Sequence, residues 1–201
     1  ERVPQEQIGT VERVGSWFAK DCGPFAGWAA LCERGLPVAP DETSRSSLLW
    51  TLSQVLLRAG ELDRALAYAK ENIEVCTQLQ EPVTAAQSQG IIADIFELRG
   101  QLDEALDIRY EEQLPVYEKL GVIRERALTI GQIANILQKR GEFDEALRLY
   151  YEESLPVYEE IGDIQERATT LGRIAEILQM RGQLDKALRI RREEQLPVYE
   201  K

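Results

Sequence analysis

The chain contains no histidine among its 201 residues, and this absence removes several classes of chemistry. Ser-His-Asp and Cys-His catalysis both need an imidazole base, and mixed His/Cys zinc sites need an imidazole ligand. Carboxylate pairs and lysine chemistry survive this exclusion. Neither GxxxxGK nor GxGxxG occurs, so the sequence offers no phosphate-binding loop. We therefore predict a protein that is not an enzyme, with no catalytic residues, no metal and no cofactor.

Cysteine and positive charge are also scarce. Three cysteines, Cys22, Cys32 and Cys76, form no CxxC pair, which favours reduced, buried thiols and a cytoplasmic protein. The 24 basic residues are outnumbered by 35 acidic ones, and the net charge is −11. This balance argues against nucleic acid and against an anionic membrane surface as partners. No run of eighteen apolar residues is present, so we expect no membrane-spanning segment.

The sequence is rich in internal repetition. The segments 100–140 and 141–181 are each 41 residues long and are identical at 26 positions. A third copy starts at Gly182 and stops in mid-repeat at Lys201, and a diverged copy spans 60–99. A period near 40 residues is typical of solenoids, in which each repeat buries its apolar face against its neighbours. Because the chain begins at Glu1 and stops within a repeat, we expect it to be a fragment.

Residues 1–40 lie outside the repeat and predict an N-terminal helical hairpin that caps the array. Apolar residues at Ile8, Val11, Val14 and Phe18 have helical spacing, and a second short helix begins at Phe25. Residues 41–201 predict helix pairs at about 41–80, 81–121, 122–162 and 163–201. The predicted fold is therefore all-α, a right-handed α-α superhelix, or solenoid, of antiparallel helix pairs.

Residues that recur in every copy predict how each pair is built. Gly121 and Gly162 stand where a left-handed helix C-cap is needed, and Asp163 can cap the helix that follows. Small residues recur where two helices must approach closely, on the first helix (Ala93, Ala134, Ala175) and on the second (Ala65, Ala105, Ala146, Ala187).

Two recurring residues do not suit a helix interior. Gly90, Gly131 and Gly172 fall in the middle of the first helix, and we interpret them as sites of close helix packing, with room for a ligand backbone as the alternative. Pro115, Pro156 and Pro197 fall inside the second helix, where an interior proline costs about 3 kcal/mol. We predict that each proline kinks the second helix or breaks it into two segments.

The repeat resembles the tetratricopeptide family. Ile133-Ala134, followed by Gly141, Phe143 and Ala146, matches the family's order of large residue, small residue, turn glycine, aromatic and alanine. The resemblance covers about residues 44–201, although the family's usual unit is 34 residues. The longer unit is similar to the extended repeats of bacterial signalling proteins. The resemblance implies a scaffold whose concave groove, lined by first helices, binds a protein or peptide.

Positions that vary between copies on the first helices are the candidate groove residues. They are Gln54, Arg58, Asp94, Glu97, Asn135, Gln138, Lys139, Glu176 and Gln179. Some family members bind a carboxylate with Lys and Asn at such positions, but Asp94 and Glu176 would repel one. We therefore expect a partner that is basic or neutral rather than acidic. Self-association through the uncovered C-terminal helix is a further possibility.

Three charge patterns complete the sequence-based predictions. The Glu-Glu pairs, such as Glu152-Glu153, recur once per repeat and belong to surface ladders such as Asp144, Arg148 and Glu152 rather than to a metal or catalytic site. Arg126 and Arg167 predict a buried ion pair with the preceding repeat. The alternative function is a regulatory or sensor arm of a larger signal-transducing NTPase or protease.

Overall fold

The computed structural model describes residues 25–195, and every regular element in that range is a helix. The helix predicted around Val11 lies outside the described residues, and so do Cys22 and Pro197. The chain divides into two compact units, unit 1 (Glu1–Ile108) and unit 2 (Arg109–Lys201). None of the described helices is both long and apolar enough to cross a membrane. The predicted fold class, an all-α solenoid of antiparallel helix pairs, is confirmed.

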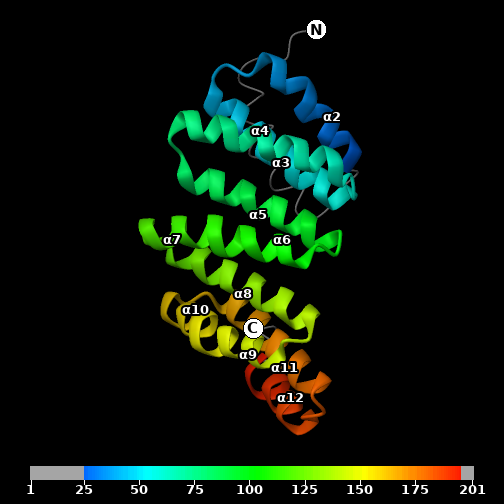
Figure 1. Ribbon diagram of the computed structural model, residues 1–201, viewed down its shortest axis with the longest axis vertical. Helices are drawn as coiled ribbons and strands as arrows, with labels where there is room; N and C mark the ends of the chain where they lie inside the picture. The colour runs from blue at the N-terminus through cyan, green and yellow to red at the C-terminus, as the bar shows by residue number, and fades with distance from the viewer. Residues whose placement is uncertain (1–24, 196–201) are drawn as a thin grey trace. The chain divides into compact units, whose positions relative to one another are not determined.

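Unit 1 is a row of helices in which each packs against the next in sequence (Figure 1). Its elements are α2 (Phe25–Gly35), the 3-10 turn η1 (Leu36–Val38), α3 (Glu42–Ala59), α4 (Leu62–Leu79), α5 (Pro82–Leu98) and α6 (Leu102–Asp107). Short turns force neighbouring helices to run antiparallel. Helix α2 spans Phe25–Gly35, where the sequence predicts a second short helix beginning at Phe25.

Helix ends in unit 1 follow from local side-chain and backbone chemistry. The Asp41 carboxylate accepts a hydrogen bond from the Ser44 amide at 2.7 Å and so caps α3. This bond holds the pKa of Asp41 below its usual value. At the other end of α3, Gly60 has φ +78°, a left-handed conformation that glycine adopts without strain.

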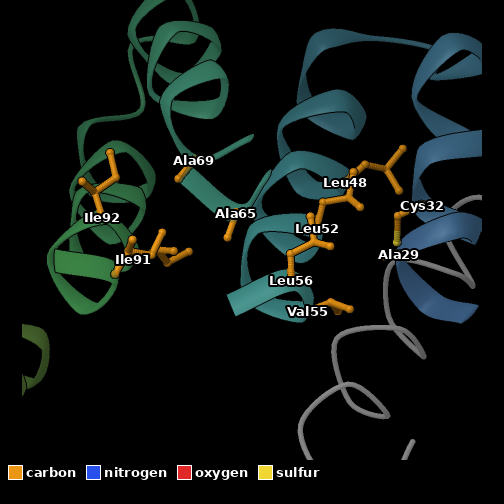
Figure 2. Packing of buried hydrophobic residues seen from close by; sticks show 11 residues of the cluster. Ala29, Cys32, Leu48, Leu52, Val55, Leu56, Ala65, Ala69, Ile91 and Ile92 are labelled. Carbon is orange, nitrogen blue, oxygen red and sulfur yellow. The ribbon is translucent and has the colours of Figure 1, made fainter. Parts of the chain in front are cut away.

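The apolar core of unit 1 is drawn from α2, α3, α4 and α5 (Figure 2). Leu48, Leu52 and Leu56 recur every four residues along α3 and are almost completely buried. Small residues, including Ala65 and Ala69 of α4, meet them across the helix interfaces. The helices approach closely because these positions carry no more than a methyl group.

Unit 2 continues the same alternation of first and second helices. After the π-helical turn η2 (Ile108–Gln113), it contains α7 (Leu114–Leu120), α8 (Ile123–Arg140), α9 (Phe143–Leu149), the π-helical turn η3 (Tyr150–Ser154), α10 (Leu155–Ile161), α11 (Ile164–Met180), α12 (Leu184–Ile190) and the π-helical turn η4 (Arg191–Gln195). Asp163 accepts a hydrogen bond from the Glu166 amide at 3.1 Å, and Gly162 has φ +70°. The predicted cap of α11 is therefore confirmed.

The second helix reaches the repeated proline through a π-helical turn, and its backbone stays helical on both sides of that turn. The predicted break into two segments is therefore wrong, and the predicted kink stays a prediction. In unit 2, α9 and α10 are joined by η3, and Pro156 lies in the first turn of α10. The Leu155 amide bonds to the Tyr150 carbonyl five residues earlier, which is the π-helical pattern. A proline needs no amide partner in a helix's first turn, so the π-helical turn moves the residue to a position where it fits.

The predicted small-residue seams are confirmed throughout the described residues. Ala93, Ala134 and Ala175 on the first helices are completely buried. On the second helices the same is true of Ala65, Ala105 and Ala146, and Ala187 is 4% exposed. Any larger side chain at these positions would have to displace a neighbouring helix.

Candidate functional site

A pocket of about 140 Å³ lies in unit 2 between the first helices α8 and α11. We call it the α8–α11 pocket. Helix α8 contributes Leu128, Gly131, Gln132 and Asn135. Helix α11 contributes Glu166, Thr169, Thr170 and Arg173, and the second helix contributes Tyr150 and Tyr158.

The second helix supplies the buried part of the pocket. Tyr150 and Tyr158 are each 2% exposed. Tyr150 begins the π-helical turn, and Ser154 at its end donates a hydrogen bond to the Ala127 carbonyl of α8 at 3.2 Å. The π-helical turn that accommodates Pro156 therefore also places Tyr150 against α8.

Gly131 borders this pocket, and close packing does not require a glycine there. A Cβ at Gly131 would lie 3.7 Å from the Ser154 Oγ and 3.9 Å from Tyr150 Cε1, which are ordinary van der Waals distances. Our packing interpretation is therefore wrong for this residue. The missing side chain leaves space at the pocket wall instead.

Charged groups stand at the rim of the pocket and are paired with neighbours. Arg173 contacts the Glu176 carboxylate at 3.3 Å, and Glu166 lies 3.9 Å from Arg124. Burial raises the pKa of Tyr158 well above its usual value, and the nearby Glu166 carboxylate acts in the same direction. The phenol of Tyr158 is therefore neutral across the physiological range, and the pocket has an uncharged floor.

A completely buried arginine lies next to this pocket. Arg109 Nη1 donates to Gln132 Oε1 at 2.6 Å and to Gln113 Oε1 at 3.1 Å. Gln132 thus connects the buried guanidinium to the pocket wall. Arg109 occupies the position that Tyr150 takes one repeat later.

The structure brings some of the predicted groove residues to the pocket and leaves others apart. Asn135 lines it, and Glu176 reaches it through Arg173. Gln138 and Lys139 on α8 and Gln179 on α11 lie on the same helices but do not line it. In unit 1, Gln54 and Arg58 lie on α3, and Asp94 and Glu97 lie on α5. Gln54, Asp94 and Glu97 are half-buried, whereas Arg58 is exposed.

Sequence reasoning missed several pocket residues that a wider reading of the helix face would have included. Gln132 and Arg173 precede Asn135 and Glu176 by three residues, and Leu128 and Thr169 precede them by seven. Residues with these spacings share one face of a helix. Tyr150 and Tyr158 carried no such signal because the π-helical turn that positions them is not visible in the repeat spacing.

The predicted inter-repeat ion pairs are present but are only partly buried. Arg126 contacts Glu118 of the preceding repeat at 3.2 Å and Glu153 of its own repeat at 3.1 Å. Arg167 contacts Glu159 in the same way at 3.0 Å. The two arginine side chains remain about one-third exposed, because long side chains keep their charged ends in water.

Of the predicted ladder of Asp144, Arg148 and Glu152, the Arg148–Glu152 ion pair is present and the Asp144–Arg148 pair is not. Arg148 contacts Glu152 at 3.6 Å, with Glu145 and Glu153 as further partners. Asp144 instead pairs with Arg181 of the next first helix at 2.5 Å. Within residues 25–195, no group of three or more His, Cys, Asp or Glu is placed to hold a metal ion.

Comparison with known families decides the classification. The sequence profile described as "Tetratricopeptide repeat" matches residues 125–193, and a second profile with the same description matches residues 46–69. Residues 46–69 and 125–193 are therefore identified as tetratricopeptide repeats. No curated protein sequence matches this tetratricopeptide chain.

Solved structures share the fold of this tetratricopeptide array at low sequence identity. BtubC (BKLC) from P. vanneervenii is 17% identical with a TM-score of 0.73, and the match covers 92% of this chain and 79% of that one. Aspartyl phosphate phosphatase F from Bacillus subtilis is 13% identical with a TM-score of 0.78, and the match covers 96% of this chain but only 49% of the phosphatase. A Rap protein complexed with competence and sporulation factor is 13% identical with a TM-score of 0.62, covering 98% of this chain and 66% of that one.

The two tetratricopeptide matches support the broad functional prediction. Tetratricopeptide repeats are in general non-catalytic scaffolds of protein–protein interaction, so this chain is an interaction scaffold.

Proposed function

We propose that the α8–α11 face of unit 2 is the binding wall of this scaffold and takes a protein segment or peptide. One observation carries the proposal: the α8–α11 pocket opens between two first helices and contains Asn135, a residue that varies between repeats. Polar groups around an uncharged floor are typical of a recognition site. A Rap protein of the same fold, complexed with competence and sporulation factor, is consistent with this use of the fold.

The chemistry of the partner follows from charge. The whole chain carries a net charge of −11, which attracts basic segments and repels acidic ones over distances of about 10 Å at moderate salt. The rim of the pocket holds both signs, with Arg173 paired to Glu176. We therefore propose a basic or neutral partner. The cytoplasmic location remains a prediction.

A capture experiment with paired variants tests the wall. The double variant Asn135→Ala/Arg173→Ala removes two polar groups of the pocket, and we expect it to lose partners that the wild-type chain retains from a cell extract. The matched control Gln165→Ala/Arg189→Ala removes an amide and a guanidinium at exposed positions outside the pocket. Equal capture by the wild type and by both double variants would reject the wall as the binding surface.

Two further functional predictions have support of their own. The sensor-arm alternative is supported by the match to aspartyl phosphate phosphatase F, of whose length this chain spans about half. The full-length reading frame tests it, because an adjoining catalytic domain would be visible at once. Self-association is supported by α12, where Leu184 and Leu188 are more than half exposed, and sedimentation of the wild type against Leu184→Glu/Leu188→Glu tests it.

A further inference from the structure

The α8–α11 pocket has a size and a set of hydrogen-bonding groups that select one kind of ligand group. We propose that it binds a single apolar side chain of about the size of leucine, from an extended peptide segment. We further propose that the side-chain amide of Gln132 donates a hydrogen bond to the backbone carbonyl next to that side chain. This inference rests on the proposed function and specifies what the wall recognises.

The size and lining of the pocket set the side chain. Its volume is about 140 Å³, and an apolar cavity of about 150 Å³ accepts a molecule as large as benzene. The buried lining residues are Tyr150, Tyr158 and Thr170, and the half-buried Leu128 and Gly131 stand beside them. A charged side chain would lose its hydration against this floor without gaining a buried partner. An apolar side chain loses nothing and gains contact with two aromatic rings.

The orientation of the Gln132 amide is fixed by chemistry. A guanidinium only donates hydrogen bonds, so the group that faces Arg109 at 2.6 Å must be the oxygen of the Gln132 amide. The NH₂ group of the same amide must then point away from Arg109. Among the residues that the structure describes, no protein acceptor for this NH₂ group is found. It is a donor held at the wall of an apolar pocket, where a peptide carbonyl is the matching acceptor.

Arg109 acts through Gln132 and is a positioning residue. It is completely buried, and Gln113 also accepts from the same Nη1 atom at 3.1 Å. This second bond fixes the position of the Arg109 guanidinium. Gln132 can then approach the guanidinium only with its side-chain oxygen. The pocket therefore presents a donor and never an acceptor at this point. Ligand groups that themselves donate at this position are disfavoured.

The test uses the whole chain, labelled with ¹⁵N, and three small probes. N-acetyl-leucine N-methylamide supplies an apolar side chain between two carbonyls, and the lysine and glutamate analogues supply charged side chains on the same backbone. We expect the leucine probe to shift the side-chain NH₂ signals of Gln132 in a saturable way, and the charged probes to leave them unchanged. Equal shifts with all three probes, or no shift up to the solubility limit of the leucine probe, would overturn the proposal.

Matched variants separate the pocket from the fold. Gln132→Glu keeps an oxygen facing Arg109 but loses the donor, so we expect the leucine probe to bind about fivefold more weakly. Gln165→Glu adds the same charge at an exposed site outside the pocket and should leave binding unchanged. Gly131→Ala fits without a clash but fills part of the pocket, so binding should fall while the helix gains stability. Unchanged binding in Gln132→Glu would refute the role of the donor.

The role of Arg109 needs a readout other than stability. Arg109→Lys retains the charge but loses the fixed geometry of the guanidinium. We expect it to move the Gln132 NH₂ signals in the absence of any probe and to weaken leucine binding. A variant that melts earlier but keeps both the signals and the binding would show that Arg109 is only structural. If the leucine probe binds but the wild-type chain captures no protein through the wall, the proposed function is rejected and this inference stands. If the wall captures protein but the leucine probe produces no response, this inference is rejected and the proposed function stands.

Discussion

Replacing Ala65 by leucine tests the close packing on which every helix pair depends. Ala65 is completely buried in the core of unit 1, whereas Ala67, two residues later on α4, is exposed. The two Cβ atoms point about 160° apart, because successive residues of an α-helix are rotated by about 100°. The pair therefore places the same substitution on opposite faces of one helix.

The expected difference follows from what the added atoms meet. Three extra carbon atoms at Ala65 must enter a space already filled by neighbouring helices, which costs about 1–3 kcal/mol. In a unit of this size, each kcal/mol lowers the melting temperature by about 4–8 °C, so we expect a drop of about 4–24 °C. At Ala67 the leucine faces water and has nearly the helix propensity of alanine, so the change should stay within about 0.5 kcal/mol.

Thermal unfolding followed by circular dichroism measures both variants against the wild type. Ala146→Leu repeats the test in unit 2, where that alanine is also completely buried. Equal melting temperatures for Ala65→Leu and Ala67→Leu would refute the argument, because the helix face would then make no difference.

Three further predictions concern other parts of the chain. Ser154→Ala removes the hydrogen bond to the Ala127 carbonyl and should destabilise unit 2 by about 1 kcal/mol in urea unfolding, and no change would mean that the bond is not formed in solution. The Asp41 pKa is lowered by the Ser44 amide, so its stabilising effect is present above the unfolded pKa and is lost as pH falls through the folded pKa. Wild type should therefore lose stability in acid relative to Asp41→Asn, whose amide also caps the helix, and parallel pH profiles would contradict this. Burial raises the pKa of Cys32 to about 11, so alkylation of this thiol at pH 8, followed by mass spectrometry, should be slow until the chain unfolds.

Features set by neighbouring residues were predictable from the sequence. The Asp163 cap and the left-handed Gly121 and Gly162 depend only on a few residues around each helix end. The buried alanines were predictable because they recur at the same position in each repeat. Helix caps depend on neighbouring residues and buried alanines recur with the repeat, so both kinds of feature can be predicted from a single sequence.

Features set by the meeting of two helices were not predictable in detail. The pocket floor is formed by Tyr150 and Tyr158, which belong to the second helix, whereas sequence reasoning placed every candidate on first helices. The pairing of Arg109 with Gln132 joins residues 23 positions apart and has no repeat signature, because the next copy carries Tyr150 instead of arginine. Asp144 pairs with Arg181 rather than with Arg148 of its own helix for a similar reason, because the packing of α11 brings Arg181 close to it.

The π-helical turn also corrects the helical phase of the second helix. Tyr158 follows Ala146 by twelve residues, which in an uninterrupted α-helix would rotate it by about 120° away from that alanine. The one extra residue in η3 removes about 100° of this rotation, so both side chains are buried on nearly the same face. A deletion of one residue within Tyr150–Ser154 would leave Tyr158 only about 20° out of phase with Ala146, because eleven residues of regular α-helix separate them, but it would place Pro156 in the interior of that helix. The π-helical turn therefore accommodates one extra residue in the second helix without rotating α10 out of phase with α9.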